Sequence, residues 1–228
     1  MSHQLTSEEQ FSEIKGFLAK TWKIIVAVIV IGLIAVWGWR YWHSHQGQKS
    51  IDASDTYEQL VAKLDSNVPA SVDELVAFAK QNDTTYAIFA DLRAAQFYVE
   101  ARKDYEGAKQ LLSDALKKTD VEPIQSIINV RIARLQYQLT QYEESLKSLD
   151  KVTETSWSAV VNDVRGDVLI KMERYGDAIN AYQVVLASTP SPELEKAVKI
   201  KLNQAEYLKA KQAVDQASQQ NAQEASKN

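Results

Sequence analysis

Few residues in this 228-residue chain suit metal binding or nucleophilic chemistry. There is no cysteine, and the histidines are His3, His43 and His45. His43 and His45 lie two residues apart, but a zinc site takes three or four protein ligands, and the nearby chain adds only Asp52 and Asp55. We therefore interpret the histidine pair as polar residues near a membrane interface, and we expect no metal and no cofactor.

Other signs of catalysis are also missing. The sequence has no phosphate-binding glycine loop and no motif of a serine nucleophile. Adjacent acids such as Glu143 and Glu144 fall at a predicted helix start, where carboxylates favour the helix dipole. The net charge is −4 and no basic run reaches five residues, which argues against a nucleic-acid partner. The sequence thus predicts a non-enzymatic, protein-binding chain.

One apolar stretch decides where the rest of the chain functions. Between Lys23 and Arg40 lie sixteen uncharged residues, which as a helix cover roughly 24 Å. A bilayer core of about 30 Å is reached if the flanking Lys and Arg extend to the headgroups and the aromatic residues lie at the interfaces. We predict a transmembrane helix over 22–42.

Two alternatives for this stretch are a buried core helix and a cleaved signal peptide. A core helix seldom lacks a polar position over sixteen residues. A signal peptide needs small residues after the apolar run, whereas this run ends in Trp37-Gly38-Trp39-Arg40. Both are less favourable than a permanent anchor.

Flanking charges predict the orientation of the span. Lys15, Lys20 and Lys23 precede it, and Arg40 and Lys49 follow. This small bias places the N-terminus inside. Residues 1–21 then form a cytosolic amphipathic tail.

The tail carries an apolar stripe that has two interpretations. Phe11, Ile14 and Leu18 share one face of a predicted helix. The stripe would lie on the membrane surface or bind a cytosolic protein, and the adjacent membrane favours the first.

Beyond the span, residues 43–211 show helical periodicity with few breakers. Helices over 50–64 and 71–80 are expected to pair. Three further helix pairs resemble degenerate tetratricopeptide repeats, over 92–118, 129–152 and 162–190.

The repeats share a spacing with a physical cause. Each has an aromatic residue at its turn and a small residue three positions later, and the small residues Ala108, Ser145 and Ala178 are 37 and 33 residues apart. A small residue lets two helices approach closely, and a large one such as Leu112 then fills the space toward the next pair. Since one pair cannot bury its apolar face alone, the pairs are expected to stack into a solenoid. A generic array of α-α hairpins is the alternative.

The chain is expected to end with a capping helix and a tail. Ser191-Pro192 begins the helix, which carries Leu194, Val198 and Leu202 toward the last repeat. The polar segment 212–228 is predicted to be disordered. The predicted class is therefore all-α, with one N-terminal transmembrane helix, a solenoid similar to tetratricopeptide repeats, and a C-terminal capping helix.

First helices of such pairs line a concave groove, so they supply the predicted protein-binding residues. Each residue could instead pack within the array. The set is apolar and of both charge signs, and it lacks the clustered Lys, Arg and Asn that acidic C-terminal peptides would need. Its members are Arg93, Phe97, Ile127, Val130, Arg134, Tyr137, Val160, Asp163, Asp167 and Ile170.

The order of these parts resembles a known family. A short tail with a Phe/Ile stripe precedes an anchor ending in "GWRYWHSHQ", and "RGDVL" lies in the last repeat. In this the chain is similar to the YfgM family, the ancillary subunits of the bacterial Sec translocon. The resemblance implies a single-pass inner-membrane protein with a cytoplasmic N-terminus and a periplasmic repeat domain.

The resemblance also implies partners. They are the SecYEG channel, the membrane-anchored periplasmic chaperone PpiD and emerging client polypeptides, which the protein would pass to chaperones. As a second implied role, the protein would restrain a stress-response regulator of the RcsB type through its cytosolic tail. An assembly factor for another envelope complex is a further alternative.

The anchor itself is a possible contact surface. Gly32, Ala35 and Gly38 lie three residues apart and would let another membrane helix approach closely, although the spacing is not the four-residue motif of tight pairs.

Overall fold

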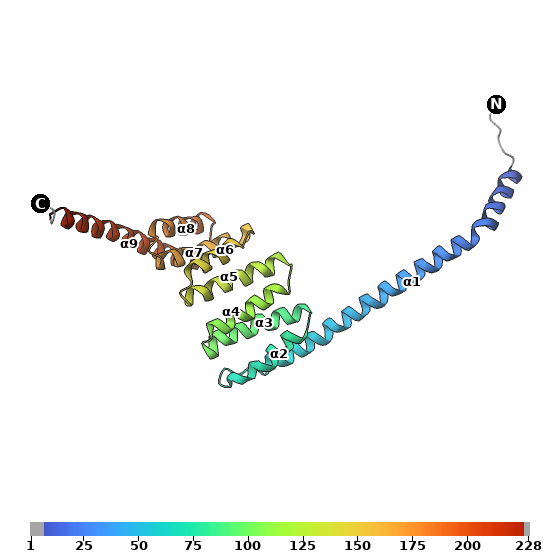
Figure 1. The fold of residues 1–228 in the computed structure, drawn as a ribbon, viewed down its shortest axis with the longest axis horizontal. Coiled ribbons are helices and arrows are strands. Elements are labelled where there is room, and N and C mark those ends of the chain that lie inside the picture. Colours follow the sequence, from blue (N-terminus) through green and yellow to red (C-terminus); the bar gives the residue numbers. More distant parts are fainter. Residues whose placement is uncertain (1–6, 226–228) are drawn as a thin grey trace, which may run out of the picture. The chain divides into compact units, whose positions relative to one another are not determined.

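The computed structural model describes residues 7–225, with side chains described for all of them except residues 7–21, 25, 42–47, 222, 224 and 225. Every regular element in the described range is a helix (Figure 1). The chain divides into two compact units, Met1–Asp52 and Ala53–Asn228. The predicted all-α class is confirmed for the described part of the chain.

Helix α1 (Ser7–Ala62) forms the described part of the first unit up to Asp52, and its last turns, from Ala53 onward, belong to the second unit. Its segment Trp22–Tyr41 is 20 residues long, which is about 30 Å of helix. All described side chains of this segment are exposed, including Ile31 and Ile34 at 66% each. Such exposure argues against a core helix, because that much apolar surface is unfavourable in water. Length and composition suit a membrane span.

The second unit begins with the end of α1 and α2 (Asp73–Gln81), which are connected through the short 3-10 helix η1 (Pro69–Val72). Ala53 of α1 and Leu75 of α2 are buried in the same apolar cluster. Both helices contribute to one core, whereas the extensive helix-to-helix contact of α2 is with α3, so the pairing stays a prediction.

Three helix pairs follow in chain order (Figure 1). Within each pair the two helices contact one another, and the pairs correspond to the three predicted repeats. The structure adds a π-helical turn at the end of α3 and a 3-10 turn before α7. The elements are α3 (Thr85–Phe97) with η2 (Tyr98–Arg102), α4 (Tyr105–Lys117), α5 (Glu122–Gln138), α6 (Tyr142–Asp150), η3 (Thr155–Trp157), α7 (Ser158–Lys171) and α8 (Tyr175–Ala187).

The turn within each of these pairs contains one residue in the left-handed conformation. The φ angle is 56° at Lys103, 59° at Thr140 and 58° at Glu173. Each lies five positions before the small residue of its repeat, so the backbone follows the same period as the sequence. In the second repeat the N–H of Gln141 donates to the carbonyl of Gln136 at 2.8 Å, as in a Schellman helix ending. The corresponding bond in the third repeat is 2.9 Å long.

Close packing within the pairs follows the predicted mechanism. The three small residues Ala108, Ser145 and Ala178 are fully buried. The large residues four positions later, Leu112, Leu149 and Tyr182, are at most 2% exposed and fill the space beside them. The Ser145 hydroxyl donates to the Ala133 carbonyl at 2.7 Å, which satisfies its polar group inside the core.

The last helix, α9 (Pro192–Ala225), covers the third repeat. Val198 and Ala205 are fully buried against α7 and α8, which confirms the capping role. The predicted disorder over 212–228 differs from the structure, which is helical through Ala225. The physical reason is that this segment is polar but rich in Ala and Gln and free of Gly and Pro. A helix that begins by docking can therefore propagate through it.

Candidate protein-binding groove

Two adjoining cavities lie along the first helices of the repeats. The first, of about 330 Å³, lies among α3, η2, α4 and α5, and the second, of about 440 Å³, extends to α7. They share Val99, Arg134 and Leu135, so we treat them as one groove, called the inner groove below. The first cavity is also lined by Leu92, Ala95, Gln96, Glu100, Leu112 and Arg131, and the second by Tyr105, Tyr137, Gln138, Asp163, Val164 and Asp167.

The structure brings four of the predicted groove residues together at the inner groove. Arg134 and Tyr137 come from α5, and Asp163 and Asp167 come from α7. Arg93 lies beside the groove, where its guanidinium donates to Gln96 at 2.8 Å. The ligand that these residues would bind stays a prediction.

The other five predicted residues pack within the array. Phe97 and Val130 are 7% and 2% exposed and belong to the core, which corrects their assignment to the groove. Ile127, Val160 and Ile170 are half-buried against the core clusters. The physical reason is that each first helix is buried on two sides, so a rotation of one residue, roughly 100°, exchanges core and groove positions.

The same rotation explains why the sequence-based prediction omits some residues that line the groove. On α5 the lining positions are 131, 134, 135, 137 and 138, whereas the predicted set is 127, 130, 134 and 137, so the two sets share 134 and 137. In both sets members recur at helical spacings of three or four residues. The additional residue of greatest chemical interest is Arg131, one helical turn before Arg134.

The acidic residues of the inner groove are held by the capping helix. The Lys201 ammonium donates to Asp163 and to Asp167, at 2.7 Å in each case. The Tyr182 hydroxyl donates to Asp167 at 2.8 Å. Both carboxylates are therefore already paired, and the network ties α9 to α7 and α8.

This network shifts the pKa values of two of its members. Burial raises the pKa of Tyr182 well above its usual value, and the Asp167 carboxylate raises it further. Burial lowers the pKa of Lys201, but the hydrogen bonds that it donates to Asp163 and Asp167 outweigh this effect, so the net pKa lies above the usual value of 10.5. Lys201 thus stays charged, and Tyr182 neutral, throughout the physiological range.

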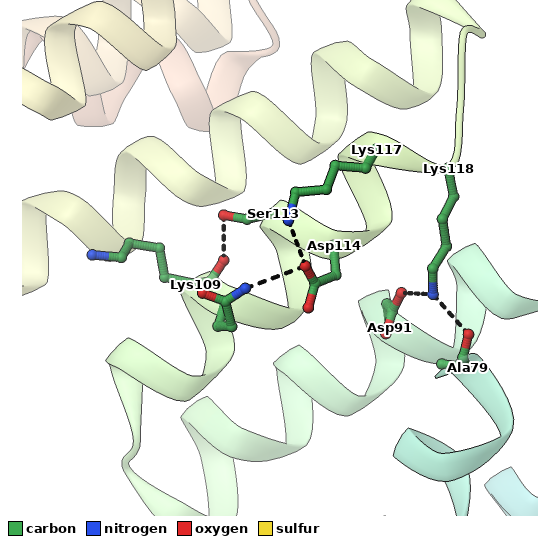
Figure 2. A network of polar contacts seen from close by, with 8 residues as sticks. Ala79, Asp91, Lys109, Ser113, Asp114, Lys117 and Lys118 are labelled. Carbon is green, nitrogen blue, oxygen red and sulfur yellow. Dashed lines mark hydrogen bonds and ion pairs between the residues drawn. The ribbon is translucent and has the colours of Figure 1, made fainter. Parts of the chain in front are cut away.

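A second polar network lies outside the groove and is structural. Figure 2 shows the Lys118 ammonium donating to Asp91 at 2.6 Å and to the Ala79 carbonyl at 2.7 Å. Asp91 is 1% exposed. Burial raises its pKa above the usual 3.8, although the bond from Lys118 opposes the shift. This network joins α2, α3 and the end of α4, and Asp91 is enclosed rather than open to a substrate.

The remaining candidate sites lie in the first unit. Gly32 and Gly38 are in α1, and a methyl group added at either would meet nothing within 4 Å. Leu33, Ile34 and Trp37, with Gly38 and Tyr41, line a shallow apolar hollow on this helix. Ala35 is exposed on the same helix.

The structure does not test the other predictions for the first unit. Phe11, Ile14 and Leu18 lie in α1, but their side chains are outside the described set, as are those of His43 and His45, and His3 precedes the described residues. Across the described residues, there is no group of three or more His, Cys, Asp or Glu side chains that could hold a metal ion.

A stack of α-α pairs with a capping helix, following one helix suited to a membrane, defines the class: a tetratricopeptide-repeat-like protein with a candidate anchor. The family model "Tetratricopeptide repeat-like domain" matches residues 15–207. The chain belongs to the YfgM family, as the resemblance in its sequence predicted.

Two relatives show how far the likeness extends. A protein of Escherichia coli (strain K12) named "Ancillary SecYEG translocon subunit" is 33% identical over 195 residues, which is 86% of this chain and 94% of the relative. A protein of the same name from Aggregatibacter actinomycetemcomitans is 30% identical, over 89% of this chain and 99% of the relative.

A solved structure supports the fold. It is the crystal structure of Bacillus thuringiensis PlcR in complex with the peptide PapR7 and DNA, with a TM-score of 0.53 at 18% identity. The alignment covers 71% of this chain and 65% of PlcR, slightly less than two thirds of that protein.

Proposed function

We propose that this protein is a membrane-anchored ancillary subunit of the Sec translocon, with a non-catalytic repeat domain that binds polypeptides. The observation that carries the proposal is the 33% identity, over 86% of the chain, with the Escherichia coli protein named for this role. A stacked repeat scaffold with a groove suits protein binding, because it presents an extended surface from several helices.

The proposed placement follows from the flanking charges. The N-terminus is cytoplasmic, the span crosses the inner membrane once, and the repeat domain is periplasmic. In this orientation the inner groove meets polypeptides as they emerge from the channel. The protein would then pass them to periplasmic chaperones, with the membrane-anchored PpiD as the expected partner.

The anchor is proposed to contact the translocon within the bilayer. Gly32, Ala35 and Gly38 expose little side-chain volume, so another membrane helix could approach closely there. Since added methyl groups at the two glycines meet nothing in this chain, bulky substitutions would change the contact surface without an internal clash.

Affinity purification of the full chain from membranes in mild detergent tests the proposal. SecYEG and PpiD should be recovered with the wild-type chain. Replacing residues 22–42 by an unrelated apolar span of equal length, or making Gly32→Leu with Gly38→Leu, should reduce the recovery of SecYEG if the anchor is the contact. Absence of SecYEG from the wild-type preparation, after crosslinking in cells, would contradict the proposed function.

A protease-accessibility experiment tests the orientation. In intact spheroplasts the repeat domain should be digested from outside, whereas a tag placed before residue 7 should stay protected. The opposite pattern would place the groove in the cytoplasm and overturn the hand-off role.

A further inference from the structure

Two arginines in the inner groove have no acceptor within the part of the chain that the structure describes. Arg131 and Arg134 lie three residues apart on α5, which places them on neighbouring positions of one face. Both line the first cavity, yet no hydrogen bond or ion pair joins either guanidinium to any described residue. By contrast, Lys201 engages both Asp163 and Asp167 in the adjoining cavity.

This arrangement leaves two guanidinium groups without a protein acceptor among the described residues, beside a low-polarity wall. Arg131 is half-buried, and burial, followed by repulsion from Arg134, lowers its pKa. Glu100 also lines the cavity, but its carboxylate is exposed and accepts from the Gln96 amide at 2.8 Å. A guanidinium offers several N–H donors in a planar fork that fits a carboxylate through two parallel bonds. A carboxylate is therefore the ligand group that suits this pair of arginines.

The walls around the arginines indicate what should accompany that charge. Leu92, Val99, Leu112 and Leu135 line the first cavity, so the ligand should carry apolar groups beside its carboxylate. Arg134 is common to both cavities, and the second cavity continues past it toward α7. A carboxylate bound at this junction has groove on either side, which suits an internal acidic side chain better than a chain terminus.

We propose that the inner groove binds a polypeptide segment in which an Asp or Glu side chain lies between apolar residues, with its carboxylate on Arg131 and Arg134. The proposal rests on the proposed function and specifies the chemistry of the segment that the repeat domain binds. It corrects the expectation that this face lacks clustered basic residues, because the structure adds Arg131 to Arg134.

Fluorescence anisotropy with the full chain in detergent micelles tests the site. The probe is a labelled peptide with blocked ends and a single central Glu flanked by Leu and Val, and the comparison peptide has Gln in place of that Glu. Arg131→Gln with Arg134→Gln should weaken the Glu peptide at least about tenfold, which is typical of losing a hydrogen bond between charged groups. The Gln peptide should bind weakly to both proteins.

Matched variants separate this effect from general charge and from misfolding. Lys151→Gln removes one positive charge from an exposed position outside both cavities and should leave binding unchanged. Arg134→Gln alone changes an exposed side chain, so it keeps the test valid should the double variant lose its helical circular dichroism.

Each outcome decides the proposal. Equal affinity for the Glu and Gln peptides, no effect of the arginine substitutions, or no binding of either peptide would overturn it. Binding that requires an unblocked C-terminus would also overturn it, in favour of a terminal carboxylate. Recovery of SecYEG from membranes is measured separately. The peptide-binding proposal can therefore be refuted while the proposed function holds, and the proposed function can be refuted while peptide binding holds.

Discussion

The closest approach between the helices of the third repeat makes a quantitative prediction for Gly166→Ala. A methyl group at Gly166 on α7 would lie 2.6 Å from Cζ and 2.7 Å from Cδ1 of the Tyr182 ring on α8. Carbon atoms in favourable contact are about 3.5–4.0 Å apart. The ring cannot simply swing away, because Tyr182 is 1% exposed and its hydroxyl donates to Asp167 at 2.8 Å. The substitution therefore forces α7 and α8 apart or breaks this bond.

The expected size of the effect combines two opposing contributions. Overpacking a well-packed core costs about 1–3 kcal/mol. Ala in place of Gly in a helix interior recovers up to about 1 kcal/mol. Since several ring atoms are crowded, we expect a net loss of about 1–2 kcal/mol in the free energy of unfolding. For a domain of this size each kcal/mol lowers the Tm by roughly 2–4 °C.

Gly176→Ala provides the matched control. There the nearest atom to an added methyl group is the Lys209 ammonium nitrogen at 3.8 Å, an ordinary contact. We expect Gly176→Ala to be neutral or to stabilise by up to about 1 kcal/mol. Combining Gly166→Ala with Tyr182→Leu should remove most of the cost of the first substitution, since the ring is gone.

The assay is thermal and urea unfolding of the full chain, followed by circular dichroism, with hydrogen exchange to locate the change. Repeats contact only their neighbours, so protection should fall in α7, α8 and α9 more than in α2–α4. Equal stability of the Gly166→Ala and Gly176→Ala variants would refute the reasoning. So would an undiminished cost of Gly166→Ala in the Tyr182→Leu background.

Three further substitutions test other parts of the fold. Asp91→Asn should cost about 2–4 kcal/mol in the free energy of unfolding, because it removes the partner of the Lys118 charge. Since the folded pKa of Asp91 is raised, the stability advantage of the wild type should widen as the pH falls from 7 toward 3.8. A difference in urea unfolding that stays constant with pH would contradict this. Lys201→Met should cost about 1–3 kcal/mol in the free energy of unfolding and increase hydrogen exchange in α9. Because the folded pKa of Lys201 is raised above 10.5, its stabilising contribution should be fully present below that pH and lost above the folded pKa. A stability advantage of the wild type over Lys201→Met that persists unchanged well above pH 10.5 would argue against the network. Thr140→Gly should stabilise by up to about 1 kcal/mol, because a β-branched residue at φ 59° is strained; a lower Tm would show that the turn gains from the side chain.

The helix pairs were predictable because their signals are local. The turn aromatic and the small residue five positions after the left-handed turn both lie within one repeat, and each acts on its own neighbours. The positions of Ala108, Ser145 and Ala178 therefore indicated both the pairing and the close approach. The length of α9 was not predictable in the same way, since polar composition indicates solvent exposure and does not determine whether an exposed segment is helical.

The groove was harder to predict because its residues depend on helix rotation. Each first helix contacts the core on two sides, so only a narrow strip remains for the groove, and the apolar residues Phe97 and Val130 fit either surface by type. Sequence periodicity shows that residues three or four positions apart share one face of a helix. Packing against the neighbouring repeats determines which of these faces points into the groove. The polar members, Arg134, Asp163 and Asp167, line the second cavity, because the core disfavours charged side chains.

The charge of the groove shows why its chemistry needed the structure. In the sequence, the predicted face carries charges of both signs and lacks the clustered Lys, Arg and Asn that acidic C-terminal peptides would need. In the structure both aspartates accept a hydrogen bond from the single Lys201 ammonium, which lies 38 and 34 residues away on a different helix. Arg131 and Arg134 receive no such partner among the described residues. The two guanidinium groups are therefore free to bind a carboxylate, because a tertiary contact of the capping helix engages the neighbouring aspartates. It follows that Lys201→Met should weaken the Glu peptide as well as destabilise α9, because the released carboxylates would compete for the same arginines.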